Sequence, residues 1–169
     1  MNTFLSFNYI ERARRYSNRR LIIEFTLLAF ALKIVLTVPW IIWIDTSANP
    51  KLVTEMNDPG DPLLFVAVAC LAGPIIETLV GQWLPIRIAQ IWSRSRWVWI
   101  GVSILFFSSL HLFAGFIGVL TTAGPAFFFA LCFVLKREVS RWQAVWVTTV
   151  VHALHNGIAL SFYFLEQAL

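Results

Sequence analysis

The sequence contains little charge and little cysteine. Charged residues make up 13% of its 169 residues, whereas soluble domains carry roughly 25%. Hydrophobic residues make up 59%, and the mean hydropathy is +0.74. So few charges could not keep so apolar a chain in water, which excludes a soluble enzyme, a disordered tail and a conventional nucleic-acid-binding protein. The two cysteines, Cys70 and Cys132, both lie in apolar runs, so a disulfide framework and a cysteine-based zinc site are excluded as well.

Long hydrophobic runs are what the chain has instead. A hydrocarbon core about 30 Å thick needs roughly 20 apolar residues of helix. Five runs fit this length, at 21–44, 62–85, 97–114, 117–135 and 143–165. The third and fourth meet around Gly115 and Gly118, where a re-entrant turn would fit. The sequence therefore predicts an all-α polytopic membrane bundle of about five helices, with residues 21–169 forming one transmembrane domain.

The basic residues predict the orientation of this bundle. Eleven of the thirteen fall before the first run, between the second and third, or between the fourth and fifth. They are Arg12, Arg14, Arg15, Arg19, Arg20, Arg87, Arg94, Arg96, Lys136, Arg137 and Arg141. The loop 45–61 is mainly acidic. Since cytoplasmic loops carry the excess of lysine and arginine, we expect a cytoplasmic N-terminus. Residues 1–20 are interpreted as a basic amphipathic segment that lies against anionic lipid.

Few ionisable side chains lie within the predicted spans, and such residues are functional candidates by default. They include Glu77 and all three histidines, His111, His152 and His155. By helix rise, Glu77 lies about 15 Å, His152 about 16 Å and His111 about 22 Å from the nearest basic segment. The first two depths match, and a tilt would bring His111 to the same layer. The alternative for each residue is a hydrogen-bonded or packed side chain without a chemical role.

Two further features accompany these residues. His152 and Asn156 share one helix face because they are four residues apart. His155 is one position off that face, as a supporting partner or an alternative ligand. Lys33 lies in the middle of the first span; we favour a side chain that extends outward along its stem, with pairing to an interior carboxylate as the alternative. Glu24 is expected to pair with Arg20 one turn earlier.

A carboxylate with imidazoles beside it can hydrolyse an amide through an activated water. The carboxylate acts as general base, one imidazole holds the water and moves a proton, and a second imidazole with a carboxamide stabilises the oxyanion. One glutamate and two histidines can also hold a divalent metal ion. The H-E-x-x-H pattern of zinc proteases is not in the sequence. We therefore expect no cofactor, with a divalent metal as the open alternative.

The ordered patterns Pro74-x-x-Glu77, Phe107-x-x-x-His111 and His152-x-x-x-Asn156 resemble the three motifs of the CPBP family. These intramembrane proteases include the CAAX-protease and bacteriocin-processing types and are also called the ABI family. The resemblance covers about residues 62–160. It implies a helical bundle with a water-accessible cavity, in which Glu77 is the catalytic glutamate and His111 activates water. His152 and Asn156 would form the oxyanion site, and Phe107 would serve packing.

The chain departs from the first motif of that family, Glu-Glu-x-x-x-Arg, at two positions. Thr78 stands for the second glutamate and Gln82 for the arginine. Both can form hydrogen bonds, so we expect them to keep the cavity polar beside Glu77. The departures favour a divergent bacterial subgroup, in the inner membrane, over a protease of CAAX-type tails.

Three functions are consistent with this set of polar residues. The first is an intramembrane endopeptidase acting on a membrane-associated protein or peptide precursor, with membrane lipid and that substrate as its partners and no nucleic acid. The second is a non-catalytic membrane adaptor or immunity protein of the same fold, which the retained glutamate and histidines disfavour. The third is a proton-coupled carrier, and it is disfavoured because such carriers are commonly built from repeats and the sequence shows none.

Overall fold

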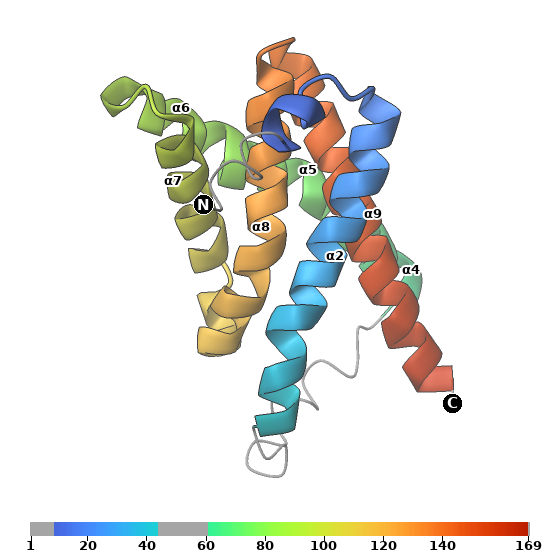
Figure 1. The fold of residues 1–169 in the computed structure, drawn as a ribbon. Helices are drawn as coiled ribbons and strands as arrows, with labels where there is room; N and C mark the ends of the chain where they lie inside the picture. The colour runs from blue at the N-terminus through green and yellow to red at the C-terminus, as the bar shows by residue number, and fades with distance from the viewer. Residues whose placement is uncertain (1–8, 44–60, 169) are drawn as a thin grey trace.

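The computed structural model describes residues 9–43 and 61–168, and all regular structure within these ranges is helical (Figure 1). Five helical stretches run back and forth, in agreement with the predicted all-α membrane bundle. They are α2 (Asn18–Trp43), the stretch Pro62–Trp92 with α4 (Pro62–Ala67), α5 (Gly73–Glu77) and α6 (Leu84–Trp92), then α7 (Arg96–Ser109), α8 (Gly115–Arg137) and α9 (Arg141–Ala168). Residues 1–8 of the predicted amphipathic segment and the acidic loop 45–60 lie outside the described residues.

Four of the five stretches are long and apolar enough to cross a membrane, and α7 is shorter. Its 14 residues measure only about 21 Å along the helix axis. The predicted run 97–114 is thus not one continuous helix: α7 ends at Ser109, a 3₁₀ turn follows at Leu112–Ala114, and Gly115 reverses the chain with a φ of 70°, a left-handed value that glycine adopts without strain. This turn ends short of the lower ends of α2 and α9 (Figure 1).

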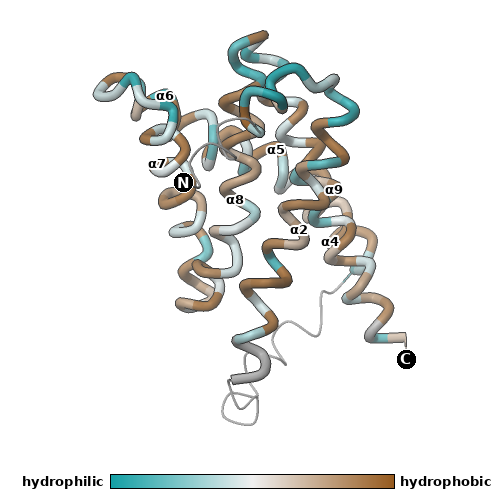
Figure 2. Tube along the Cα trace, viewed as in Figure 1, coloured by the Kyte–Doolittle hydropathy of each residue, from teal (hydrophilic) through white to brown (hydrophobic). Residues whose placement is uncertain are grey.

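The basic segments meet at one end of the bundle. Glu138, in the turn between α8 and α9, accepts from Arg14 of the N-terminal segment at 3.1 Å and pairs with Arg96 at the start of α7 at 2.8 Å. Figure 2 shows this end as the most hydrophilic part of the molecule. The expected pair of Arg20 and Glu24 is also present, at 3.4 Å. The basic segments of the sequence therefore meet at one end of the folded bundle.

The core is centred on α8, which packs against α2, α7 and α9. Its C-terminal half is buried on every side, and phenylalanines fill the space between the helices: Phe25, Phe107, Phe129 and Phe133 are almost fully buried. Helices α2 and α9 run in the same direction. Thr26 of α2 bonds to the carbonyl of Val151 of α9, and further along both helices Phe30 contacts His155. The stretch Pro62–Trp92 lies outside this core and keeps most of its apolar side chains exposed.

Candidate active site

The stretch Pro62–Trp92 is interrupted by two π-helical turns, Val68–Ala72 and Thr78–Trp83, on either side of α5. In the first turn the N–H of Gly73 donates to the carbonyl of Val68, five residues back. The carbonyl of Ala69 therefore loses its α-helical donor. Its π-helical donor would be Pro74, which has no N–H. The π-turn and the proline together leave the Ala69 carbonyl without a partner in its own helix.

A side chain from α9 takes up that carbonyl. Asn156 Nδ2 donates to Ala69 O at 2.8 Å. The second π-turn repeats the arrangement: Pro85 lacks the N–H that an α-helix would direct to Gly81 O, and Ser103 Oγ of α7 donates to Gly81 O at 2.8 Å. Both interruptions are thus bonded from outside, which is how non-helical backbone is tolerated at membrane depth. Such π-turns occur frequently at functional sites.

Glu77 lies at the end of α5, between the two π-turns. Its Oε2 is 3.6 Å from Nε2 of His152, and the Glu77 side chain remains 33% exposed while that of His152 is 4% exposed. The separation exceeds a direct hydrogen bond, so both groups keep positions open for bonding to a water. Glu77 Oε1 lies against the bare Cα of Gly73, where a Cβ would come within 3.4 Å. The carboxylate is therefore held inside the bundle yet remains accessible.

Two phenylalanine rings hold the histidines in place. The ring of His152 stacks on Phe129 of α8, with centroids 4.4 Å apart, and meets the edge of Phe107 at 5.6 Å. The same Phe107 ring contacts His111 at 5.1 Å. Phe107 and Phe129 are 2% and 1% exposed. These buried rings fix the positions of both imidazoles, and the role of Phe107 is packing.

The structure places His111 differently from the sequence analysis. It lies in the turn after α7 rather than inside a helical span, because α7 ends at Ser109. Its Nδ1 is 3.0 Å from the carbonyl of Phe107. Since a carbonyl only accepts hydrogen bonds, Nδ1 carries the hydrogen, and Nε2 of the neutral ring is free to accept. His111 is also close enough to Glu77 and His152 to interact with both electrostatically.

The remaining candidates surround this centre. Thr78 and Gln82 are fully buried, and neither the Thr78 hydroxyl nor the two polar atoms of the Gln82 amide has a hydrogen-bond partner in the described part of the chain. His155 is 3% exposed, contacts Phe129 edge to face and also contacts Phe30 of α2. Asn156 is engaged with a backbone carbonyl, as described above. Buried amides normally form hydrogen bonds, so the unpaired atoms of Gln82 are available to a buried water.

The site offers few ligands for a metal ion. Among the described residues, no three or more histidine, cysteine, aspartate or glutamate side chains are close enough together to hold an ion. Glu77 and His152 could provide two ligands, and the third would have to come from water, substrate or a rearranged side chain.

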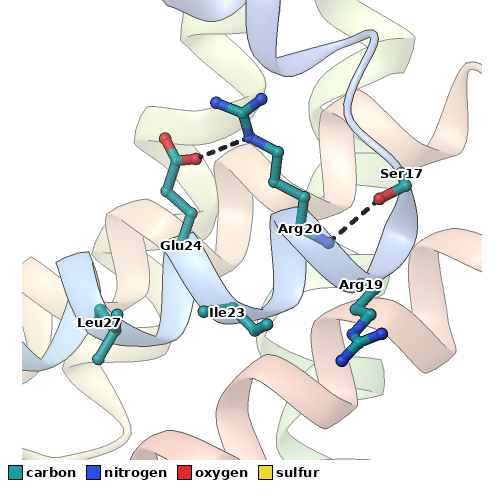
Figure 3. Close-up of a pocket in the computed structure, with 6 residues that line it drawn as sticks. All are labelled: Ser17, Arg19, Arg20, Ile23, Glu24 and Leu27. Carbon is teal, nitrogen blue, oxygen red and sulfur yellow. Dashed lines mark hydrogen bonds and ion pairs between the residues drawn. The ribbon is translucent and has the colours of Figure 1, made fainter.

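A hollow on the outer side of α2 lies at the basic end, lined by charged and aliphatic side chains (Figure 3). It contains the Arg20–Glu24 pair and shares no residue with the Glu77 centre. Its position beside exposed Ile23 and Leu27 indicates a groove at the membrane interface rather than part of the active site.

Sequence reasoning missed two residues of the site. Ser103 and Phe129 belong to none of the three motifs. Ser103 supports the second π-turn, and Phe129 carries the His152 ring. The only sequence signal for Ser103 was a serine within an apolar run. Its partner, the carbonyl of Gly81, is 22 residues away in the sequence. Nothing in the sequence distinguishes Phe129 from its neighbours Phe127 and Phe128.

Fold and site together define an integral membrane bundle with a carboxylate and imidazoles between its helices. The family described as type II CAAX prenyl endopeptidase Rce1-like matches residues 59–158, more than half of the chain. The protein therefore belongs to the Rce1-like family and is a membrane protease at the level of that family, which confirms the resemblance seen in the three motifs. Neither a curated protein nor a solved structure matches the chain.

Proposed function

We propose that the protein is an intramembrane endopeptidase that cleaves a membrane-associated protein or peptide precursor with a water activated by Glu77. The observation that carries the proposal is the 3.6 Å approach of Glu77 and His152 inside the bundle. In the reaction Glu77 takes a proton from the water, and the hydroxide bonds to the carbonyl carbon of the scissile peptide. The proton then passes to the departing amine, so that one water is consumed for each bond cleaved.

The neighbouring groups have distinct roles in this proposal. His111 accepts from the attacking water through Nε2, because its Nδ1 hydrogen is engaged with Phe107. His152, whose Nε2 lies 3.6 Å from Glu77, forms the oxyanion site together with Asn156. Asn156 uses one hydrogen of Nδ2 for Ala69 and has a second that can reach the oxyanion of the tetrahedral intermediate. Thr78, Gln82 and His155 keep the surroundings polar. The proposed reaction uses these side chains and no metal ion. The proposed location of the protein is a bacterial inner membrane.

The test is cleavage of a tagged library of membrane-proximal peptides by purified protein. Glu77→Gln keeps the size of the side chain and removes the base, so we expect a loss of about 10²- to 10⁴-fold in kcat. The matched control is Glu11→Gln, which removes an exposed carboxylate at the basic end and should cleave like the wild type. Each reaction is run with and without a chelator.

The outcomes separate the competing mechanisms. Cleavage that is lost in Glu77→Gln and kept with chelator supports the metal-free mechanism. Loss with chelator as well would mean that the same residues hold a metal ion. Equal cleavage by Glu77→Gln and wild type would refute the role of Glu77. Peptides that bind to both proteins and are cleaved by neither would favour the non-catalytic adaptor.

A further inference from the structure

Lys33 lies in the middle of α2, on the side that faces the interior. The face of α2 that contains Thr26 and Phe30 also contains Lys33, because these residues follow each other at helical spacing. Thr26 bonds to α9, and the ring of Phe30 lies 6.0 Å from that of His155. The exposed residues Ile23, Leu27, Ile34 and Val38 lie about a quarter turn away around the helix. Lys33 is therefore half-buried on the side of α2 that contacts α9, which differs from the outward extension favoured from the sequence.

The ammonium group of Lys33 has no counter-charge in the described part of the chain. None of the ion pairs or hydrogen bonds there includes its Nζ. The residue is half-buried, so a ligand can reach it. A lysine charge at this depth is costly unless an anion or a polar cavity compensates it. Among the described residues Lys33 does not pair with an interior carboxylate, since Glu77 approaches His152 instead.

Lys33 is part of the same electrostatic neighbourhood as the active-site histidines. It is close enough to His155 and His152 to affect both. The Nδ1 atoms of the two imidazoles have no hydrogen-bond partner in the described residues. Lys33 thus lies within electrostatic range of His152, which Glu77 approaches through Nε2. A peptide held for attack near Glu77 would therefore lie close to the ammonium group.

We propose that Lys33 binds a carboxylate of the substrate close to the scissile bond and thereby selects the segment that is cleaved. This inference rests on the proposed function, because it assigns the substrate chemistry of that site. The carboxylate can come from a free C-terminus or from an acidic side chain, and an ammonium group recognises both in the same way. On binding, the charge of Lys33 is compensated by the substrate, and Glu77 stays free to act as the base.

The experiment compares three dansyl-labelled apolar hexapeptides in detergent micelles. The first ends in leucine with a free carboxylate, the second in leucine amide, and the third in glutamate amide. The dissociation constant of each is measured by fluorescence for wild type, Lys33→Met, Lys33→Arg and Glu77→Gln. Arg19→Met is the matched control, because it removes an exposed charge from the same helix; the Arg19 side chain takes part in neither contact drawn in Figure 3.

For wild type, Glu77→Gln and Arg19→Met we expect a carboxylate peptide to bind at least about tenfold more tightly than leucine amide, the size of a charge-assisted bond. The ratio should fall to about one in Lys33→Met and be restored in Lys33→Arg. Preference for the free acid alone identifies a C-terminal carboxylate, and preference for glutamate amide alone identifies an acidic side chain. A change in the ratio cannot arise from a packing role of Lys33, which would affect all three peptides alike.

Two results would overturn the proposal: a wild type that binds all three peptides equally, or a Lys33→Met variant that keeps the wild-type ratio. Failure of the proposed function looks different, because Glu77→Gln would then cleave the library like the wild type, whatever the binding ratio. Size-exclusion profiles of the variants establish that each is folded before binding is measured.

Discussion

Helix α8 and the stretch Pro62–Trp92 are both long enough to cross a membrane, yet they differ in burial and regularity. Over their most apolar windows, 56% of the residues are buried in the α8 span and 11% in the stretch Pro62–Trp92. Helix α8 is continuous and buries its whole C-terminal half, but it contains none of the predicted reacting residues. The other stretch is interrupted by two π-turns and contains Glu77. Packing and chemistry are therefore assigned to different helices.

The difference has a physical reason. A reacting carboxylate needs access for water and substrate, which a helix surrounded by packed side chains cannot give. It also needs a fixed position, which a peripheral helix with free carbonyls would lack on its own. Here the position comes from Asn156 and Ser103, which bond to the π-turns, and from Phe129 of α8, which holds His152. The central helix thus supports the site without taking part in it.

The largest effect on this comparison should come from Phe129→Ala. The substitution removes a buried ring and leaves a cavity, so we expect a loss of about 3–5 kcal/mol in stability, measured as thermal unfolding in detergent. Phe106→Ala is the control, because that ring is 39% exposed on α7 and should cost much less. Equal losses for the two variants would show that α8 is not the supporting element.

A smaller effect is expected from Gly81→Ala, where the interrupted stretch meets α7. The added Cβ would lie 2.5 Å from Cδ2 of Phe107, so the ring that contacts both His111 and His152 must move. We expect a loss of about 1–3 kcal/mol and a fall in kcat larger than the change in KM. Gly101→Ala has nothing within 4 Å of its added Cβ and should be neutral or stabilising. A Gly81→Ala variant with wild-type kcat would contradict the role of Phe107 in positioning the imidazoles.

The smallest effect is expected from Ser103→Ala. It removes the hydrogen bond to Gly81 O, and such bonds inside membrane bundles contribute about 0.6 kcal/mol on average. The shift in thermal unfolding is compared with Ser109→Ala, whose exposed hydroxyl bonds within its own helix. If both variants unfold alike, the second π-turn does not depend on Ser103, and the comparison with α8 would rest on the first π-turn alone.

Much of the fold and part of the site could be predicted from the sequence. Hydropathy gave five helical stretches, and the basic residues predicted which segments meet at one end. The motif spacing predicted Glu77, His111, His152 and Asn156 as one group. The structure brings Glu77, His111 and His152 together and places Asn156 one turn beyond His152, bonded to Ala69; their catalytic roles stay predictions. The end of α7 at Ser109 was missed, because the run stays largely apolar up to Ala114 and hydropathy does not distinguish an α-helix from the 3₁₀ turn that follows. The position of Lys33 on the side of α2 that contacts α9 was missed too, because hydropathy does not show how a helix is rotated about its axis.

Membrane insertion, helical structure and the order of the spans are determined by the sequence itself, because apolar length and charge are properties of consecutive residues. The tertiary structure alone decided which side of each helix faces the others. Asn156 bonds to a carbonyl 87 residues away, and Phe129 rather than an adjacent phenylalanine stacks on His152. Contacts of this kind depend on the rotation and packing of whole helices, so they are fixed only when the bundle assembles.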